Sequence, residues 1–154
     1  MITKITLDDL PQVFALCDRI NNQMKFAELG YPYSTAAMRR SWPRVIDDKD
    51  HICFCHKTGD TVDGIFLARI QDSSYYMENY LVAYEIAFHS DPALSKVQRS
   101  KVILSIRNEA EKRLKSIGVK SLFISTHPGQ MAGMDSNMKK RGYRHIAEYY
   151  VREF

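Results

Sequence analysis

The residues of this chain that could do chemistry gather between positions 84 and 117. A strand-like run there contains Glu85 and stops at a loop with Pro92, and a long amphipathic helix follows. The first turns of that helix carry three cations: Lys96, Arg99 and Lys101. The first N–H groups of a helix lack a partner within it, and the helix dipole adds partial positive charge there. The segment therefore predicts a binding site for a phosphate group.

Apolar periodicity predicts the elements that position these residues. The expected strands are residues 2–6, 51–57, 62–71, 80–88, 119–125 and the tail from 143. The expected helices end near Met24, start at Ser34 or Thr35, run from Ser95 to Ser116, and run from Met134 to Lys140. Their order, β-α-α-β-β-β-α-β-α-β, predicts an α/β (α+β) protein: a mixed sheet with helices on both faces.

Local residues predict several boundaries. Thr6 with Asp9 resembles a capping box that opens the first helix. Pro43 lies inside the second helical pattern and must kink or end it. Gly59 marks the turn of a hairpin, and Gly118 is the expected stop of the long helix.

The amino-acid composition limits which class of protein this chain can belong to. At 154 residues, 45% of them hydrophobic and 26% charged, the chain reads as one soluble globular domain, residues 1–154. No apolar run is long enough to cross a membrane. A net charge of +4 suits a polyanionic small ligand and is too small to argue for nucleic-acid binding. An odd count of three cysteines disfavours a disulfide framework, and we expect a reducing compartment, the cytoplasm.

Three features resemble the GNAT superfamily of N-acetyltransferases over nearly the whole chain. The first is Glu85-Ile86-Ala87-Phe88 before the long helix, and the second is Lys139-Lys140-Arg141-Gly142-Tyr143. The third is the strand pair 51–57 and 62–71 with its tight turn. The resemblance implies a mostly antiparallel sheet of six to seven strands. It also implies transfer of an acetyl group from acetyl-CoA to an amine acceptor, either a small molecule or a protein.

The resemblance also implies site residues. Glu85 would be the general base, and a backbone N–H near Ala87 or Phe88 would polarise the thioester carbonyl. The loop that holds the coenzyme A pyrophosphate would fall on Lys96, Val97, Gln98, Arg99, Ser100 and Lys101, and it lacks the family's glycines. The family's proton-donating tyrosine is replaced by Met138, which cannot donate. The donor would then be Tyr149, Tyr150 or solvent.

Other interpretations stay open. Glu85 could be an ion-paired glutamate on a half-exposed strand, and the basic cluster could be a solvated helix start. A zinc site at His51, Cys53, Cys55 and His56 is disfavoured, because no second ligand pair exists and strand alternation turns His56 away from the others. The main alternative is a non-catalytic protein of the same fold, such as a phage virion or assembly component. The tail strand could pair with a second copy and give a homodimer.

Overall fold

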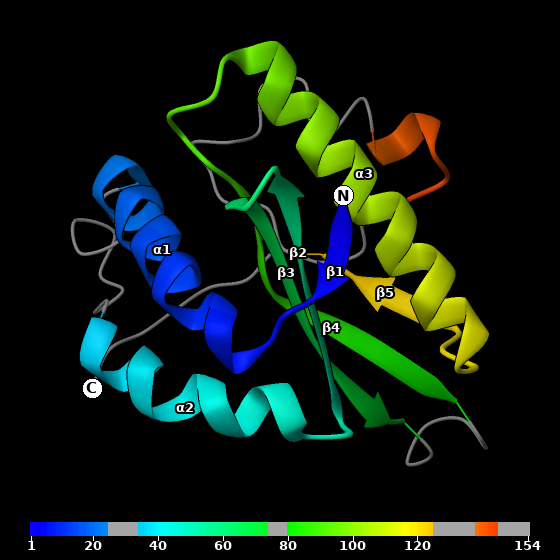
Figure 1. The fold of residues 1–154 in the computed structure, drawn as a ribbon. Helices are drawn as coiled ribbons and strands as arrows, with labels where there is room; N and C mark the ends of the chain where they lie inside the picture. Colours follow the sequence, from blue (N-terminus) through cyan, green and yellow to red (C-terminus); the bar gives the residue numbers. More distant parts are fainter. Residues whose placement is uncertain (25–33, 74–79, 125–137, 145–154) are drawn as a thin grey trace, which may run out of the picture. The chain divides into compact units, whose positions relative to one another are not determined.

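The computed structural model describes residues 1–24, 34–73, 80–124 and 138–144. The chain divides into two compact units, Met1–Ile124 and Ser125–Phe154. The first unit contains the sheet and its helices (Figure 1). In the second unit, the described part holds a helical turn at 138–140 that is followed by Gly142, in agreement with the expected end of the last helix. That residues 1–154 form a single domain stays a prediction.

The described strands form one five-stranded sheet in the order β1-β2-β3-β4-β5 (Figure 1). Its strands are β1 (Ile2–Lys4), β2 (His51–Thr58), β3 (Thr61–Asp72), β4 (Leu81–Ser90) and β5 (Ser121–Phe123). All neighbours pair antiparallel except β4 and β5, which are parallel. The mixed, mostly antiparallel sheet is confirmed, with fewer strands described than the six to seven expected. The expected final strand falls largely in 145–154, outside the described residues.

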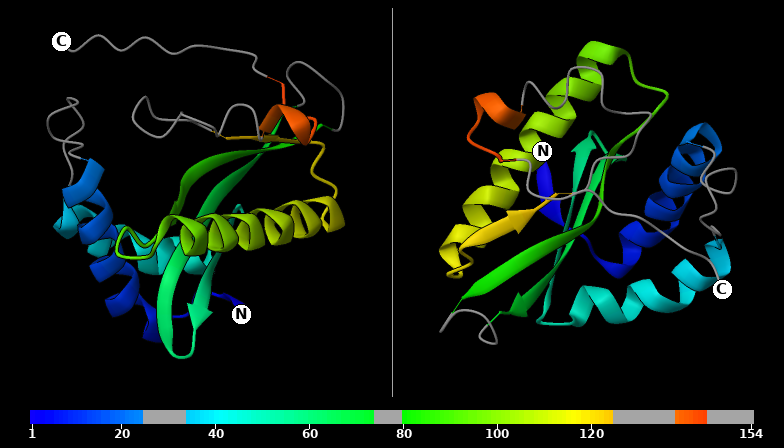
Figure 2. Two further views of the ribbon diagram at one scale, coloured as in Figure 1. Left: turned by 90° about the horizontal axis from the view of Figure 1, so that it is seen from above. Right: turned by 180° about the vertical axis from the view of Figure 1, so that it is seen from behind.

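Helices cover both faces of the sheet, as predicted. A 3₁₀ turn, η1 (Leu7–Asp9), leads into α1 (Leu10–Met24), and α2 (Thr35–Asp47) and α3 (Lys96–Ser116) follow. The right-hand view of Figure 2 shows α1 and α2 on one side of the sheet and α3 on the other. Two separate hydrophobic cores result: one contains residues of α1, α2 and the sheet, and the other contains residues of α3 and the sheet. No helix in the described part is both long and apolar enough to span a membrane.

Most of the residues expected to start or end a helix do so in the structure. The Asp9 carboxylate accepts from the Thr6 N–H and hydroxyl, both at 3.0 Å, and Ser34 caps α2 by accepting from the Ala37 N–H. Gly118 follows α3 with a φ of 85°. Pro43 does not end α2, which runs on to Asp47.

Two β-bulges interrupt the register of the sheet. In β4, Glu85 pairs with Ala68 and Ala87 with Leu67, which leaves Ile86 as an extra residue. In β3, Gly64 pairs with His56 and Val62 with Lys57, which leaves Asp63 extra. A bulge bends its strand and re-aims the neighbouring side chains. Both bulges therefore bear on where polar groups point in the site.

Candidate functional site

The candidate site lies along the edge of β4 that faces β5. β5 pairs with β4 only from Val82 to Tyr84, and beyond Tyr84 no described strand pairs with this edge. At the other edge, the N–H of Asp91 donates to the carbonyl of Asp63 in β3 at 2.8 Å. Since backbone groups alternate in direction along a strand, the N–H of Phe88 points toward the β5 side and that of Ala87 toward β3. Of the two predicted N–H donors, Phe88 is the one on the unpaired edge.

Glu85 lies directly before the β4 bulge. Its cross-strand partner Ala68 belongs to the core under α3, and paired residues point to the same face of a sheet. The Glu85 side chain is therefore on the α3 face, where it is half-buried. The structure places this carboxylate and the Phe88 N–H three residues apart on the same unpaired stretch of β4.

The loop between β4 and α3 uses most of its own N–H groups. The Ala93 N–H donates to the Asp91 carboxylate at 2.9 Å, and the Leu94 N–H to the Asp91 carbonyl at 3.2 Å. Ser95 and Gln98 form a capping box, in which the Ser95 N–H donates to the Gln98 side chain at 3.0 Å. The spacing Ser-x-x-Gln is a recognisable helix-start signal in the sequence, although the expected start of this helix was placed without it.

Two N–H groups remain for an anion at the start of α3. Within the described residues, the N–H groups of Lys96 and Val97 have no hydrogen-bond acceptor. The side chains of Lys96, Val97 and Ser100 line a shallow hollow of about 380 Å³, together with Lys101 and Leu104. An anion at the start of the helix would contact these two N–H groups instead of a run of bare peptide.

The three predicted cations do not gather on one face of α3. Lys96 and Arg99 are three residues apart and lie on neighbouring positions of the helix. Lys101 lies on another side of the helix from Arg99 and lines both the hollow beside Lys96 and a second cavity. Arg99 is half-buried, and Lys96 and Lys101 are exposed. Gln98 also lines the second cavity, which lies beside the β2–β3 hairpin. Lys96 and Arg99 are the pair closest to the predicted arrangement.

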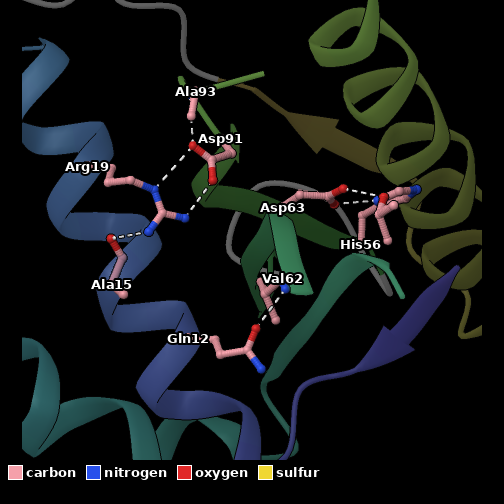
Figure 3. A network of polar contacts seen from close by, with 9 residues as sticks. Gln12, Ala15, Arg19, His56, Val62, Asp63, Asp91 and Ala93 are labelled. Atoms are coloured by element: carbon pink, nitrogen blue, oxygen red, sulfur yellow. Dashed lines mark hydrogen bonds and ion pairs between the residues drawn. The ribbon is translucent and has the colours of Figure 1, made fainter. Parts of the chain in front are cut away.

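An ion pair ties the loop to α1 (Figure 3). Arg19 donates from Nη2 to one Asp91 oxygen at 2.5 Å and from Nε to the other at 3.2 Å. Burial alone would raise the pKa of Asp91, but the hydrogen bonds from Arg19 and the Ala93 N–H outweigh it and hold the pKa below its ordinary value. Neither residue could be singled out from the sequence, because they are 72 positions apart.

The residues of the zinc interpretation are separated by the sheet. Cys53 and Cys55 are buried thiols in the core under α1 and α2, while His56 bonds Asp63 on the opposite face. His51 pairs with Asp48 at 3.1 Å. No group of three or more His, Cys, Asp or Glu side chains in the described ranges is arranged to hold a metal ion.

The predicted proton donors are not described. Tyr149 and Tyr150 lie outside the described residues, so their role stays a prediction. Met138, to which the resemblance gives the position of a tyrosine, is helical in the described residues of the second unit.

Known proteins resemble this chain in structure and not in sequence. No protein-family model matches the chain, and no curated protein matches it in sequence. A transcriptional regulator from Bacillus halodurans C-125 is similar in structure, with a TM-score of 0.77, 15% identity, and coverage of 100% of this chain and 99% of that one.

Acetyltransferases are also among the similar structures. An aminoglycoside acetyltransferase from an uncultured soil metagenomic sample, in complex with sisomicin, has a TM-score of 0.71 and 13% identity, covering 100% of this chain and 96% of that one. A GNAT family acetyltransferase from Staphylococcus aureus has a TM-score of 0.67 and 16% identity, covering 100% and 98%. The chain has the GNAT acetyltransferase fold.

Proposed function

We propose that this protein is an acyltransferase that moves an acetyl group from acetyl-CoA to an amine. The observation that carries the proposal is the bulged strand β4, whose edge beyond Tyr84 has no described strand partner. Such an edge offers backbone donors beside a half-buried carboxylate. The fold of the structural neighbours supports the same chemistry.

The residues of this chain would hold acetyl-CoA at two places, its phosphates and its thioester carbonyl. Lys96, Arg99 and the unpaired N–H groups of Lys96 and Val97 would hold its phosphates, since cations and helix N-termini favour anions. The Phe88 N–H would donate to the thioester carbonyl and stabilise the charge that develops there. When bound, acetyl-CoA supplies an activated acyl group on a thiol leaving group.

Glu85 would act as the general base. It would take a proton from the acceptor amine, which frees the nitrogen lone pair to form the N–C bond as the C–S bond of the thioester breaks. Tyr149, Tyr150 or solvent would donate a proton to the leaving thiolate.

The first experiment measures binding and turnover separately. Acetyl-CoA in large excess should raise the melting temperature, since micromolar binding stabilises a native state by a few kcal/mol. Release of the coenzyme A thiol should follow when an acceptor is added. An aminoglycoside is a suitable first acceptor, because one structural neighbour is described with sisomicin.

The base is tested by Glu85→Gln. We expect turnover to fall by about 10²-fold with acetyl-CoA affinity unchanged, because a general base acts on the rate and not on cofactor binding. Glu111→Gln, on α3, is the matched control and should leave both quantities unchanged. Equal turnover of wild type and Glu85→Gln would remove Glu85 from the role.

One observation favours a second function. The N–H groups of Ala93, Leu94 and Ser95 are bonded within the loop, so they are not available to a pyrophosphate. This arrangement suits a protein that keeps the fold without catalysis, such as a phage virion or assembly component. No shift in melting temperature at millimolar acetyl-CoA would favour that function. Binding would favour the enzyme, for which we propose a cytoplasmic location.

A further inference from the structure

Asp91 is the first residue after β4, and each of its polar groups is bonded. Its N–H donates to the Asp63 carbonyl in the bulge of β3 at 2.8 Å, and its own carbonyl accepts from the Leu94 N–H at 3.2 Å. Its carboxylate accepts from the Ala93 N–H at 2.9 Å and from two nitrogens of Arg19. One residue therefore joins the sheet, α1 and the loop that leads to α3.

The Arg19 guanidinium is held by its own helix as well. Its Nη1 donates to the Ala15 carbonyl at 3.2 Å, while Nε and Nη2 reach the two carboxylate oxygens of Asp91 (Figure 3). The planar guanidinium matches a carboxylate with two bonds at once, and the Asp91 carboxylate is buried. The loop is therefore fixed to α1 in position and in direction.

The loop from Pro92 to Ser95 leaves little freedom between Asp91 and α3. Pro92 fixes its own φ and restricts the residue before it. The Leu94 side chain packs against the core under α3, and Ser95 caps the helix. The place of the first turn of α3 therefore depends on where Asp91 is held.

We propose that Asp91 is a positioning residue, which together with Arg19 holds the start of α3 where its free N–H groups meet the phosphates of acetyl-CoA. The inference rests on the acyltransferase function proposed above. Within the described residues, the N–H groups of Lys96 and Val97 are the ones without an acceptor at this helix start. Donors that are ordered before an anion arrives bind it more tightly, because ordering them afterwards costs affinity.

Arg19 also has an electrostatic effect in this role. A carboxylate with no cation beside it would repel a phosphate at the start of α3, and the ion pair offsets that charge. Asp91 acts on the cofactor through the helix and not by contact. Its loss should therefore weaken the grip on the phosphates and leave the grip on the thioester arm unchanged.

The test compares two acetyl donors, of which only one carries phosphates. Acetyl-CoA and S-acetylpantetheine share the thioester arm, and S-acetylpantetheine has no phosphate group. The full chain, labelled with ¹⁵N, is titrated with each donor at constant ionic strength, and the amide signals of Phe88 and Val97 give the dissociation constants. Asp91→Asn should bind acetyl-CoA about tenfold more weakly than the wild type, and S-acetylpantetheine equally well.

Two further variants separate positioning from general loss of stability. Arg19→Gln frees the loop and leaves the Asp91 carboxylate without its cation, so it should weaken acetyl-CoA binding at least as much as Asp91→Asn. The double variant should lose no more than Arg19→Gln alone, because both changes break one interaction. Glu109→Gln, which breaks the ion pair with Arg113 further along α3, should leave both affinities unchanged. All titrations are made at a temperature where circular dichroism shows every variant fully folded.

Three results would overturn the inference. They are an unchanged affinity of Asp91→Asn for acetyl-CoA, an equal loss of affinity for both donors, and additive losses in the double variant. In each of these the wild type still binds acetyl-CoA, so the acyltransferase proposal stands. A wild type that binds neither donor would contradict the acyltransferase proposal and this inference with it, so the two failures can be told apart.

Discussion

Gly64 is where the sheet and α3 approach most closely. A Cβ added there would lie 2.5 Å from Val102 Cγ1 and 2.6 Å from Ile106 Cδ1, well inside the contact distance of two carbon atoms. Gly64→Ala should therefore lower the free energy of unfolding by about 1–3 kcal/mol through overpacking. Urea denaturation followed by circular dichroism measures the change.

A second variant tests the cause of that loss. Val102→Ala alone should also destabilise, because it leaves a cavity. Combined with Gly64→Ala, it makes room for the new methyl group, so the double variant should lose less stability than the sum of the two, by about 1 kcal/mol. Strict additivity would mean that the overpacking account of Gly64 is wrong.

Residues with a local role could be predicted from sequence, and residues with a long-range role could not. Thr6 and Asp9 were identified as a cap because three positions fix their geometry, and Ser95 with Gln98 carried the same kind of signal. The role of Asp63 depends on a bulge, and a bulge is a property of two paired strands. No pattern within β3 alone indicates it.

At the scale of elements, the Arg19–Asp91 pair joins α1 to the loop before α3. The Asp91 side chain is 10% exposed and that of Arg19 42%, so the pair lies between the surface and buried cases. Asp91→Asn keeps an oxygen for the Ala93 N–H but loses the charge. We expect it to lower the free energy of unfolding by about 1–2 kcal/mol at pH 7.

The pH dependence of that loss follows from the lowered pKa of Asp91. A carboxyl with a lower pKa in the folded state stabilises at pH values above its unfolded pKa, here near 3.8. The difference between wild type and Asp91→Asn should be constant from pH 7 to about pH 5, and it should shrink as the pH falls through the folded pKa. Urea titrations at a series of pH values measure it.

Glu109→Gln is the control for the loop pair. Glu109 and Arg113 form an ion pair along α3 at 2.6 Å, with both side chains more than a quarter exposed. Its loss should cost less than about 0.5 kcal/mol at pH 7. If both variants lose the same small amount, Asp91 does not fasten the loop to α1.

Most helices and strands could be predicted from the sequence, and Pro43 in α2 is the position that tests this prediction most strongly. Helices and strands appeared where the apolar periodicity changed, because each periodicity fits only one backbone geometry. Pro43 is expected to kink or end α2; it does not end the helix, which continues to Asp47, and the kink stays a prediction. Trp42 and Ile46 of this helix are buried in the core, and that packing outweighs the cost of proline in a helix.

For the molecule as a whole, the fold class followed from the order of elements, because short connections leave few topologies open. The course of α3 over the sheet could not be predicted. It decides that Lys101 lines both the hairpin cavity and the hollow at the start of α3, whereas Lys96 lines the hollow alone.

The reactivity of the three thiols tests whether the core under α1 and α2 opens as a single unit. Cys17, Cys53 and Cys55 are all buried in it. Burial raises the pKa of Cys17, helped by the charge of Asp18, to about 12, and burial also raises the pKa of Cys53 and Cys55. Since the thiolate is the reactive form, all three should be alkylated far more slowly at pH 8 than a free thiol.

Because one core encloses them, the three sites should become reactive together. Peptide-resolved mass spectrometry of N-ethylmaleimide labelling should give one rate for Cys17, Cys53 and Cys55, and low urea should raise the three rates by the same factor. A cysteine that reacts much faster than the other two would show that α1 or β2 opens on its own. Slow thiols would also give a low background in the coenzyme A release assay, so this labelling should precede it.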